Sequence, residues 1–366
     1  MLEQTNDYKS ILLNDLPLLD TRAPVEFLQG SFPTASNLPL MNDDERAAVG
    51  TCYKKKGQDA AVKLGHELVS GKIKQARMEA WLAYVTANPK GYLFCFRGGM
   101  RSQLVQEWLH EAGVDYPRIK GGYKALRQFL LQNIEQTLAT TPLVILGGKT
   151  GCGKTEILHQ LSNSIDLEGH AYHRGSSFGR HAKPQPSQIN FENNLSLDLL
   201  KKCHSAARQL VLEDEGHIIG RCALPINLVN TMKAAKIVWL DAPLEERIER
   251  VLKDYVIDLQ QEYIVTSDEQ QGKQDFAKHL LASLSRITKR LGMERFQQLH
   301  NLMQAALNET DNSTSLGLHR EWITLLLESY YDPMYSYQRQ KKADQIVFSG
   351  TADEVTEFLQ HEAILK

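Results

Sequence analysis

Short apolar runs alternate with amphipathic helical patterns along residues 1–139. Three runs are too short for helices and predict buried strands, at Leu16–Leu19, Asn37–Leu40 and Tyr92–Phe96. Apolar residues then recur at spacings of three and four from Ser102 to Gly113, and a later pattern runs to about Ala139, so both segments predict helices. An insert at about 41–90 also has helical patterns. The alternation predicts an N-terminal α/β domain over residues 1–139.

The pattern changes at Thr140–Pro142, where the helical spacing stops and a new strand begins, so a domain boundary is predicted there. Further strands are predicted at Leu143–Leu146, Gln209–Glu213, Lys236–Leu240 and Gln345–Phe348. Helices are predicted after Thr155 and at Leu195–Arg208, Leu244–Tyr255, Gln274–Asn308, Leu318–Leu327 and Ala352–Glu362. The alternation predicts a second α/β domain with a parallel sheet over residues 140–366, including a helical region at about 274–340.

The composition is that of an ordinary soluble globular protein, with 42% hydrophobic and 23% charged residues. The formal net charge of −2 argues against a protein that coats nucleic acid by bulk charge, although it allows a local basic patch. The cysteines are scattered without a CxxC pair, so neither a disulfide framework nor a zinc site is expected. The N-terminus shows no secretory signal pattern, and no apolar run approaches about 18 residues, so we expect a cytoplasmic protein without a membrane span.

Cys95 stands between a predicted strand end and a predicted helix start. The loop after it carries two arginines and two glycines, namely Arg97, Gly98, Gly99 and Arg101. If this loop curls, its backbone N–H groups, the positive end of the helix dipole and two guanidinium groups favour a thiolate and a bound oxyanion. An intracellular cysteine is more often a small buried hydrophobe. Here the adjacent residues favour a catalytic Cys95 with an anion-binding loop.

The segment Gly148–Thr155 has the pattern GxxxxGK[ST] between an apolar strand and a helix, which is the sequence context of a phosphate-binding P-loop. Its residues are Gly148, Lys149, Thr150, Gly151, Cys152, Gly153, Lys154 and Thr155. The backbone N–H groups of such a loop cradle phosphates, Lys154 neutralises the distal ones, and the Thr155 hydroxyl can hold Mg²⁺. Cys152 is expected to be tolerated in this loop rather than to be catalytic.

Polar residues elsewhere in the second domain are predicted to complete the P-loop site. Glu213 or Asp214, at the end of a predicted strand, is expected to bind Mg²⁺ directly or through water, and ordinary surface acids are the alternative. His173, Arg174 and Ser176 lie where a kinase-like fold often places a substrate loop. Their side chains suit an anion, and a plain surface loop explains them equally well.

Cations and aromatic residues concentrate in the predicted helical region, which makes it the best local candidate for contacts to RNA. The residues are Arg286, Lys289, Arg290, Tyr335, Tyr337 and Arg339. Aromatic rings can stack on bases, and cations can contact phosphates. A solvated helix face and ordinary packing at a helix end are the alternatives.

A first resemblance rests on residues upstream of Cys95. Asp20-x-Arg22, followed by a strand-borne cysteine with an arginine-bearing loop, resembles the rhodanese domain. The resemblance implies that Asp20 and Arg22 are buried structural residues and that Cys95 carries a transferable sulfur or selenium atom. From the residues alone, Asp20 or Thr21 is expected to cap the following helix. The spacing Cys-x5-Arg also resembles dual-specificity and tyrosine phosphatases, but these usually have a His directly before the nucleophile, where this chain has Phe94.

The order of all these motifs extends the resemblance to essentially the whole chain. The rhodanese-like motif, the insert with Gly50-x-x-Tyr53-Lys54, the Cys95 loop, Gly121-Gly122 and the P-loop together resemble the bacterial tRNA 2-selenouridine synthases. The resemblance implies a transferase that exchanges sulfur for selenium at the wobble 2-thiouridine of tRNA, with selenophosphate as donor. It also implies geranyl diphosphate as a co-substrate, an S-geranyl-2-thiouridine intermediate and geranyltransferase activity.

The implied partners are tRNA carrying the thiolated base and an enzyme that produces selenophosphate, whereas no haem, flavin or zinc is expected. We expect the P-loop to hold the diphosphate of geranyl diphosphate, with an ordinary nucleotide as the alternative. Other classes that fit the motifs are a rhodanese-type sulfurtransferase with a nucleotide-regulated P-loop domain, a cysteine-dependent phosphatase fusion and, more distantly, a non-enzymatic tRNA-binding module.

Overall fold

The computed structural model of the protein describes residues 2–205 and 208–360. The chain forms two compact units: unit 1 contains residues 1–136 and 192–201, and unit 2 contains residues 137–191 and 202–366. The chain first passes from unit 1 to unit 2 between Gln136 and Thr137, close to the boundary predicted at 139/140. Residues 192–201, which the sequence pattern places in the second domain, belong to unit 1, because Asn193 accepts a hydrogen bond from Arg127 and donates one to the Ser31 carbonyl.

Unit 1 is built on a five-stranded parallel sheet with the order β1-β5-β4-β2-β3. The strands are β1 (Gln4–Thr5), β2 (Leu18–Asp20), β3 (Ala35–Asn37), β4 (Tyr92–Phe94) and β5 (Arg118–Ile119). Its helices are α1 (Tyr8–Leu13), α2 (Pro24–Gln29), α6 (Met100–Glu111) and the first part of α7 (Gly122–Thr140). Three further helices form the predicted insert, namely α3 (Asp43–Lys56), α4 (Gln58–Leu68) and α5 (Gly71–Ala87). The sheet therefore has β4, the strand before Cys95, at its centre.

The start of α2 differs from the prediction. Neither Asp20 nor Thr21 caps this helix, because the Asp20 carboxylate accepts hydrogen bonds from Arg22 and the Thr21 hydroxyl donates to the Phe94 carbonyl. The carboxylate of Glu26 instead accepts a hydrogen bond from the backbone N–H of Ala23 at the helix start. Asp20 and Arg22 are fully buried, so their ion pair is part of the core.

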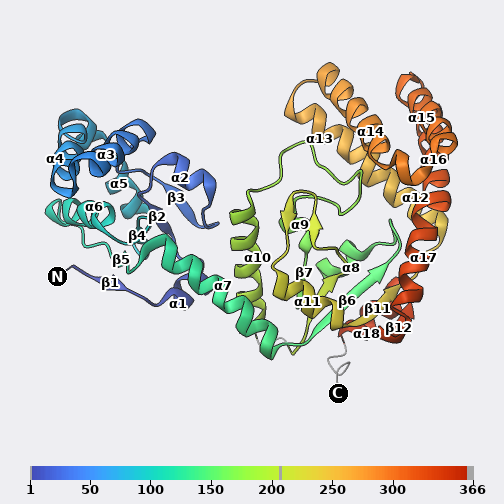
Figure 1. Ribbon diagram of the computed structural model, residues 1–366, viewed down its shortest axis with the longest axis horizontal. Helices are drawn as coiled ribbons and strands as arrows, with labels where there is room; N and C mark the ends of the chain where they lie inside the picture. Colours follow the sequence, from blue (N-terminus) through green and yellow to red (C-terminus); the bar gives the residue numbers. More distant parts are fainter. Residues whose placement is uncertain (1, 206–207, 361–366) are drawn as a thin grey trace. The chain divides into compact units, whose positions relative to one another are not determined.

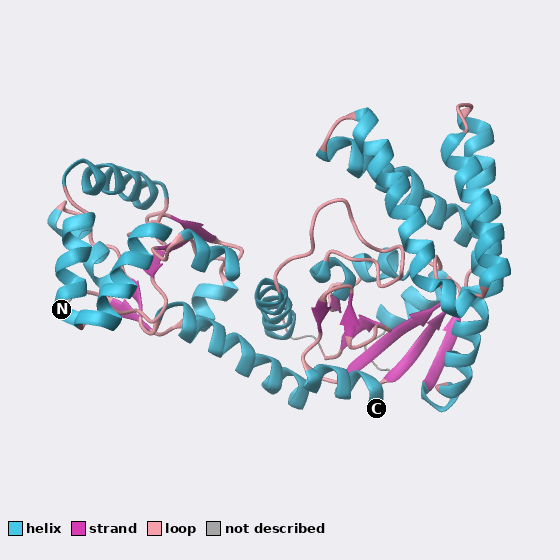
Figure 2. Ribbon diagram, turned by 45° about the horizontal axis from the view of Figure 1, so that its top comes forward, coloured by secondary structure: helices cyan, strands magenta, loops and turns pink. Residues whose placement is uncertain are grey.

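Unit 2 is built on a second five-stranded parallel sheet, with the order β12-β11-β6-β8-β7. Figure 2 shows these strands flanked by helices. The sheet strands are β6 (Leu143–Gly148), β7 (Ser164–Ile165), β8 (Leu210–Glu213), β11 (Lys236–Leu240) and β12 (Ile346–Gly350), and a separate pair is β9 (Ile218–Ile219) with β10 (Cys222–Ala223). The helices around the sheet are α8 (Lys154–Gln160), α9 (Leu167–Ala171), α11 (Ile226–Ala234), α12 (Leu244–Leu252) and α18 (Ala352–Gln360), whereas α10 (Gln188–His204) is divided between the two units, with residues 192–201 in unit 1.

The predicted helical region forms a group of long helices at one end of the unit 2 sheet (Figure 1). Its elements are the π-helix η1 (Lys253–Ile257), α13 (Asp258–Thr266), α14 (Glu269–Leu291), α15 (Met293–Asn308), α16 (Asn312–Leu326), the π-helix η2 (Leu327–Tyr331), α17 (Asp332–Lys341) and the short η3 (Ala343–Gln345). The pattern predicted one helix over 274–308, but Gly292, with φ of +86°, separates α14 from α15. The end predicted for α18, beyond Gln360, lies outside the described residues.

The helix group has a hydrophobic core of its own. Phe276 and Leu280 of α14 pack with Trp322 and Ile323 of α16 in one cluster of buried side chains. Within the described ranges, no helix is long and apolar enough to cross a membrane.

Candidate functional site

Cys95 directly follows β4, the central strand of the unit 1 sheet, which is the edge of a parallel sheet where ligands commonly bind. The loop after it leads into α6, whose N-cap is Gly99. The Cys95 side chain is buried, and the Ser102 hydroxyl oxygen lies 3.2 Å from its sulfur and 3.1 Å from the Gly99 carbonyl oxygen. The hydroxyl can therefore donate to the sulfur, which stabilises negative charge on it.

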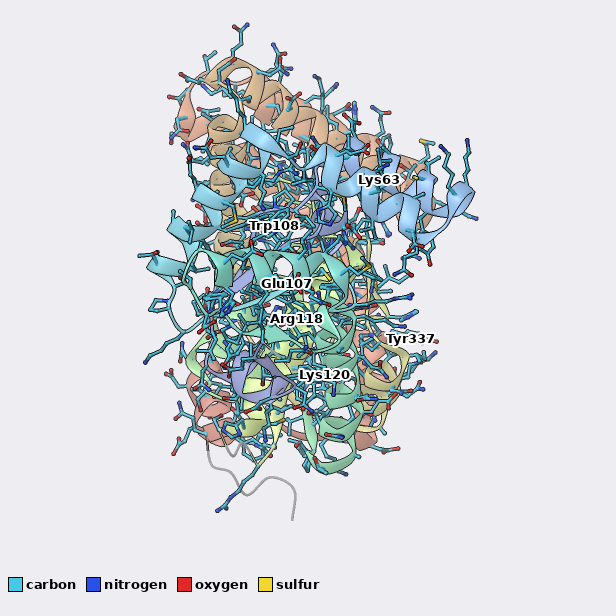
Figure 3. All side chains as sticks on the ribbon, turned by 90° about the vertical axis from the view of Figure 1, so that its left-hand side faces the viewer. Lys63, Glu107, Trp108, Arg118, Lys120 and Tyr337 are labelled. Atoms are coloured by element: carbon cyan, nitrogen blue, oxygen red, sulfur yellow. The ribbon has the colours of Figure 1, made fainter. Side chains whose placement is uncertain are left out.

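Three arginines surround the loop in different ways. Arg97 is exposed, whereas Arg101 donates to both carboxylate oxygens of Glu26, at 2.5 and 3.1 Å. Burial acts to lower the pKa of Arg101, but the Glu26 carboxylate outweighs it and holds this pKa above its ordinary value. Arg118 of β5 (Figure 3), which was not predicted as a site residue, donates to the Gly98 carbonyl at 2.5 Å. Its Nε is buried without a hydrogen-bond partner in the described part of the chain.

A close backbone approach fixes the loop. A Cβ on Gly122 would collide with the Cys95 carbonyl oxygen and the Gly98 nitrogen, and one on Gly98 would lie 2.7 Å from the Gly121 nitrogen. The backbone N–H of Tyr123 donates to the Cys95 carbonyl, and that of Lys124 donates to the Phe96 carbonyl, each at 2.9 Å. The start of α7 is therefore the platform on which the Cys95 loop rests.

The buried pair Asp20–Arg22 supports the same loop from the other side of β4. Arg22 donates to the carbonyls of Glu26 and Gly30, and its guanidinium lies 3.8 Å from the centre of the Tyr123 ring. These contacts hold α2 in place, and with it the Glu26 carboxylate that pairs with Arg101. Asp20 and Arg22 are thus positioning residues. Through Glu26 they fix where Arg101 lies, and they do not contact a ligand themselves.

The P-loop of unit 2 follows β6, which lies between β8 and β11 in the sheet. Gly151 and Gly153 have φ of +77° and +96°, which L side chains rarely adopt. A Cβ on Gly151 would lie 2.7 Å from the Arg247 carbonyl oxygen, so the loop is packed tightly against α12. Lys154 Nζ donates to the Gly148 carbonyl at 3.3 Å, while the side chain of Thr155 is on an exposed position. Cys152 is buried in the core behind the loop.

Carboxylates gather around Lys154. Burial lowers the pKa of Lys154, but Cys152 and Tyr335, followed by Glu168 and Glu215, raise it above its ordinary value. Glu168 and Glu215 share a hydrogen bond, and burial followed by repulsion from Glu215 raises the pKa of Glu168 to about 8. One proton is therefore held by this pair at neutral pH. Glu168, on α9, was not predicted as a site residue.

The two acids that the sequence predicted at this site have different surroundings. Glu213 is buried at the end of β8 and accepts a hydrogen bond from the Glu168 backbone N–H at 2.6 Å, and burial raises its pKa well above the ordinary value. Asp214 is paired with Lys342 Nζ at 2.7 and 2.8 Å. The acids that accompany Lys154 are thus Glu168 and Glu215, with Glu213 behind them.

An ion-pair cluster anchors the P-loop to the helix group. Arg247 is buried and donates to the Thr150 carbonyl at 2.9 Å and to both oxygens of Asp332, while Lys149 Nζ lies 3.2 Å from the same carboxylate. Burial raises the pKa of Asp332, but Arg247 and Lys149 outweigh this and lower it overall. Arg247 therefore pairs with Asp332 and not with the nearby acids of its own helix, whereas Arg250 pairs with Glu246 and Glu156.

The predicted substrate loop lies against the same site. A Cβ on Gly175 would lie 2.7 Å from a Glu215 carboxylate oxygen, so the loop backbone touches the acidic pair. Ser176 is hydrogen-bonded to the Tyr255 hydroxyl at 3.2 Å, and Arg174 lies 5.5 Å from the centre of that ring. Burial lowers the pKa of His173 to about 4, helped by neighbouring cations, so this imidazole is neutral at physiological pH.

The residues predicted to contact tRNA are dispersed in the structure. Arg286 donates to the Ser177 carbonyl and so secures the substrate loop, whereas Lys289 and Arg290 are exposed on α14. Tyr335 is hydrogen-bonded to Thr150 of the P-loop. Arg339 stacks over Trp239 and pairs with Asp241, and Tyr337 is exposed, with Lys341 over its ring. The exposed residues of this set are therefore Arg286, Lys289, Arg290 and Tyr337, and of these Arg286 is engaged with the substrate loop.

The described residues fit a magnesium ion only in part. No group of three or more His, Cys, Asp or Glu side chains in ranges 2–205 and 208–360 could hold a metal ion. Mg²⁺ bound with phosphates usually needs only one or two protein oxygens. The Glu168–Glu215 pair would supply such oxygens, and a bound cation would then replace the proton that this pair shares.

Comparison with known proteins extends over the whole chain. The family model for the tRNA 2-selenouridine synthase AAA domain matches residues 141–365. The tRNA 2-selenouridine synthase of Pseudomonas putida (strain GB-1) is 54% identical over 364 residues, which cover 99% of this chain and 98% of that protein. The chain belongs to the tRNA 2-selenouridine synthase family. Other members are the synthases of Pseudomonas syringae pv. syringae (strain B728a), 54% identical over 99% of both chains, and Azotobacter vinelandii (strain DJ), 53% identical over 98% of both.

Membership of the tRNA 2-selenouridine synthase family confirms the overall resemblance drawn from the motif order. The family's AAA-domain model covers the P-loop and the helix group, and the matches to the two Pseudomonas relatives extend over 99% of this chain. The residues that sequence reasoning missed, Arg118 and Glu168, lie in or beside short elements without a recognisable motif. Each is one of several charged or polar residues in its stretch, Asp115–Lys120 and Asp166–His170, so no sequence signal distinguishes it.

Proposed function

We propose that the protein is a transferase that replaces sulfur with selenium at the wobble 2-thiouridine of tRNA, with selenophosphate as the selenium donor. The observation that carries the proposal is the Cys95 thiol, held against the Ser102 hydroxyl in a loop rich in arginine and glycine at the end of the central strand. Arg97 and the N-terminus of α6 bind the selenophosphate anion, and Cys95 guides its selenium to C2 of the base. Unit 1 then acts as a rhodanese-like domain.

Geranyl diphosphate is the second co-substrate in this proposal. The thiocarbonyl sulfur of the base is a poor leaving group until it is alkylated. The sulfur attacks C1 of the geranyl group, the C1–O bond breaks, and diphosphate leaves with the electron pair. The N3 proton of the base passes to water, which gives S-geranyl-2-thiouridine. The P-loop N–H groups and Lys154 hold the diphosphate, and bound Mg²⁺ would supply further charge neutralisation.

A nucleotide at the P-loop is the second candidate, because the matching family model is described as an AAA domain. For tRNA contacts we propose the exposed residues Lys289, Arg290 and Tyr337. The reaction would take place in the cytoplasm, where tRNA and an enzyme that produces selenophosphate are available.

The full reaction can be reconstituted with purified protein, tRNA carrying 2-thiouridine, geranyl diphosphate and selenophosphate, and followed by nucleoside mass spectrometry. We expect 2-selenouridine only when both co-substrates are present, and S-geranyl-2-thiouridine when selenophosphate is omitted. Lys154→Ala should lower geranylation at least tenfold, because the charge on the diphosphate is no longer neutralised. Inhibition by excess ATP would favour the nucleotide at the P-loop, and selenation without geranyl diphosphate would contradict the alkylated intermediate.

A further inference from the structure

Unit 1 contains a cavity of about 870 Å³ between the insert and α6. This volume is in the upper part of the range of roughly 300–1,000 Å³ that small-molecule sites occupy. Its lining is mostly apolar and comes from α3, α4, α6 and the segment after β3, with Leu40, Val49, Ala61, Val62, Met100 and Leu104 among the residues. The catalytic roles described above for Cys95 and the P-loop do not explain this cavity.

The cavity adjoins the Cys95 loop through two residues. Met100 and Arg101 follow Gly99 at the start of α6, and both line the cavity. Arg101 also interacts electrostatically with Cys95. Two more cations line the cavity, Arg46 and Lys54 of α3. A ligand with an apolar chain and a nearby phosphate backbone would match this combination of apolar wall and cations.

By contrast, the apolar pocket beside the P-loop has a volume of about 20 Å³, and its wall includes Thr150, Phe178, Tyr255 and Trp322. This is little more than the space one water molecule needs, roughly 10–15 Å³, so a ten-carbon chain does not fit there. A cavity large enough for such a chain lies next to the Cys95 loop in unit 1, at Met100 and Arg101.

We propose that the unit 1 cavity binds the geranyl chain of S-geranyl-2-thiouridine while selenium is introduced, an inference that rests on the proposed function. In this step selenium from selenophosphate forms a bond to C2, the C2–S bond breaks, and the geranyl thiolate leaves with the electron pair and takes up a proton. Water takes over the phosphoryl group as phosphate when the P–Se bond breaks. The unbranched, adaptable side chain of Met100 and the aliphatic residues of the wall can pack against a branched alkyl chain.

Blocking the cavity tests this site. Gly50 of α3 lines it, and a Cβ there meets nothing within 4 Å, so Gly50→Leu adds a side chain without a backbone clash. The substrates are tRNAs with S-geranyl- or S-methyl-2-thiouridine at the wobble position, assayed with the full chain and selenophosphate. We expect wild type to prefer the geranyl substrate at least tenfold in kcat/KM, and Gly50→Leu to reduce this preference towards one.

The matched control is Ala48→Leu, an exposed position of α3 outside the cavity wall, which should keep the wild-type preference. Thr51→Phe is a second blocking variant, to be used if circular dichroism shows that Gly50→Leu is unfolded. If both blocking variants keep the wild-type preference for the geranyl substrate, the cavity does not bind the geranyl chain, while the proposed function stays intact. If wild type does not convert the geranyl substrate, both the proposed function and this inference fail.

Discussion

At the scale of single residues, the protonation of the Glu168–Glu215 pair sets the charge of the P-loop site. With one proton on the pair, Lys154 faces less negative charge and is freer to neutralise an incoming phosphate. The Ser102 hydroxyl has a similar role in unit 1, because it can turn between the Gly99 carbonyl and the Cys95 sulfur. In both sites a single proton position adjusts the charge that the ligand meets.

The raised pKa of Glu168 has a measurable effect on stability. The folded protein holds this proton up to about pH 8, whereas the ordinary pKa is 4.5, so its stabilising contribution is complete below pH 4.5 and is lost as the pH rises through 8. Glu168→Gln resembles the protonated form. Its unfolding free energy, relative to wild type, should therefore rise with pH over this interval, by at most about 1.4 kcal/mol per pH unit.

Denaturant unfolding of the full chain at pH 5, 6.5 and 8 measures this difference, with the exposed Glu245→Gln on α12 as the control for loss of a charge. If the difference in unfolding free energy between Glu168→Gln and wild type stays constant from pH 5 to pH 8, the pair does not hold a proton.

At the scale of elements, the contact between the Cys95 loop and the start of α7 shapes the first site. Gly122 has φ of +59° and no room for a Cβ, whereas Gly113 has φ of +85° and nothing within 4 Å. Alanine at Gly113 therefore adds only backbone strain, about 1–2 kcal/mol. Alanine at Gly122 adds the same strain and also pushes the Cys95 carbonyl away.

We expect Gly122→Ala to lower the unfolding free energy by at least about 2 kcal/mol more than Gly113→Ala, and to abolish selenation, whereas Gly113→Ala keeps it. Chemical denaturation and the reconstituted reaction measure the two effects. Equal losses of stability in both variants would show that the close approach does not constrain the loop.

The elements also show what a sequence can reveal. The apolar runs of β4, β6, β8 and β11 predict strands correctly, because buried parallel strands read as continuous hydrophobic segments. The two-residue strands β1, β5 and β7 have no such run, and so Arg118 on β5 could not be connected with Cys95. Glu168 was missed for a related reason, since only the fold brings α9 beside β8.

At the scale of the whole molecule, two parallel sheets each place a glycine-rich loop, a candidate anion site, directly after an interior strand, with β4 before Cys95 and β6 before the P-loop. The strand and helix patterns of the sequence predict the division of the chain into two units, apart from residues 192–201. Those residues join unit 1 through polar contacts of Asn193, which leave no trace in the hydrophobic pattern. Two loops suit a reaction with two successive substitutions, one that attaches an alkyl group to sulfur and one that replaces it with selenium.

The central claim is that Cys95 carries out the selenium step on tRNA activated elsewhere in the same chain. The most direct test is mass spectrometry of tRNA nucleosides from cells that lack this protein and are complemented with wild type or Cys95→Ser. Wild type should restore 2-selenouridine, whereas Cys95→Ser should leave it absent and accumulate S-geranyl-2-thiouridine. Full restoration of 2-selenouridine by Cys95→Ser would contradict the account.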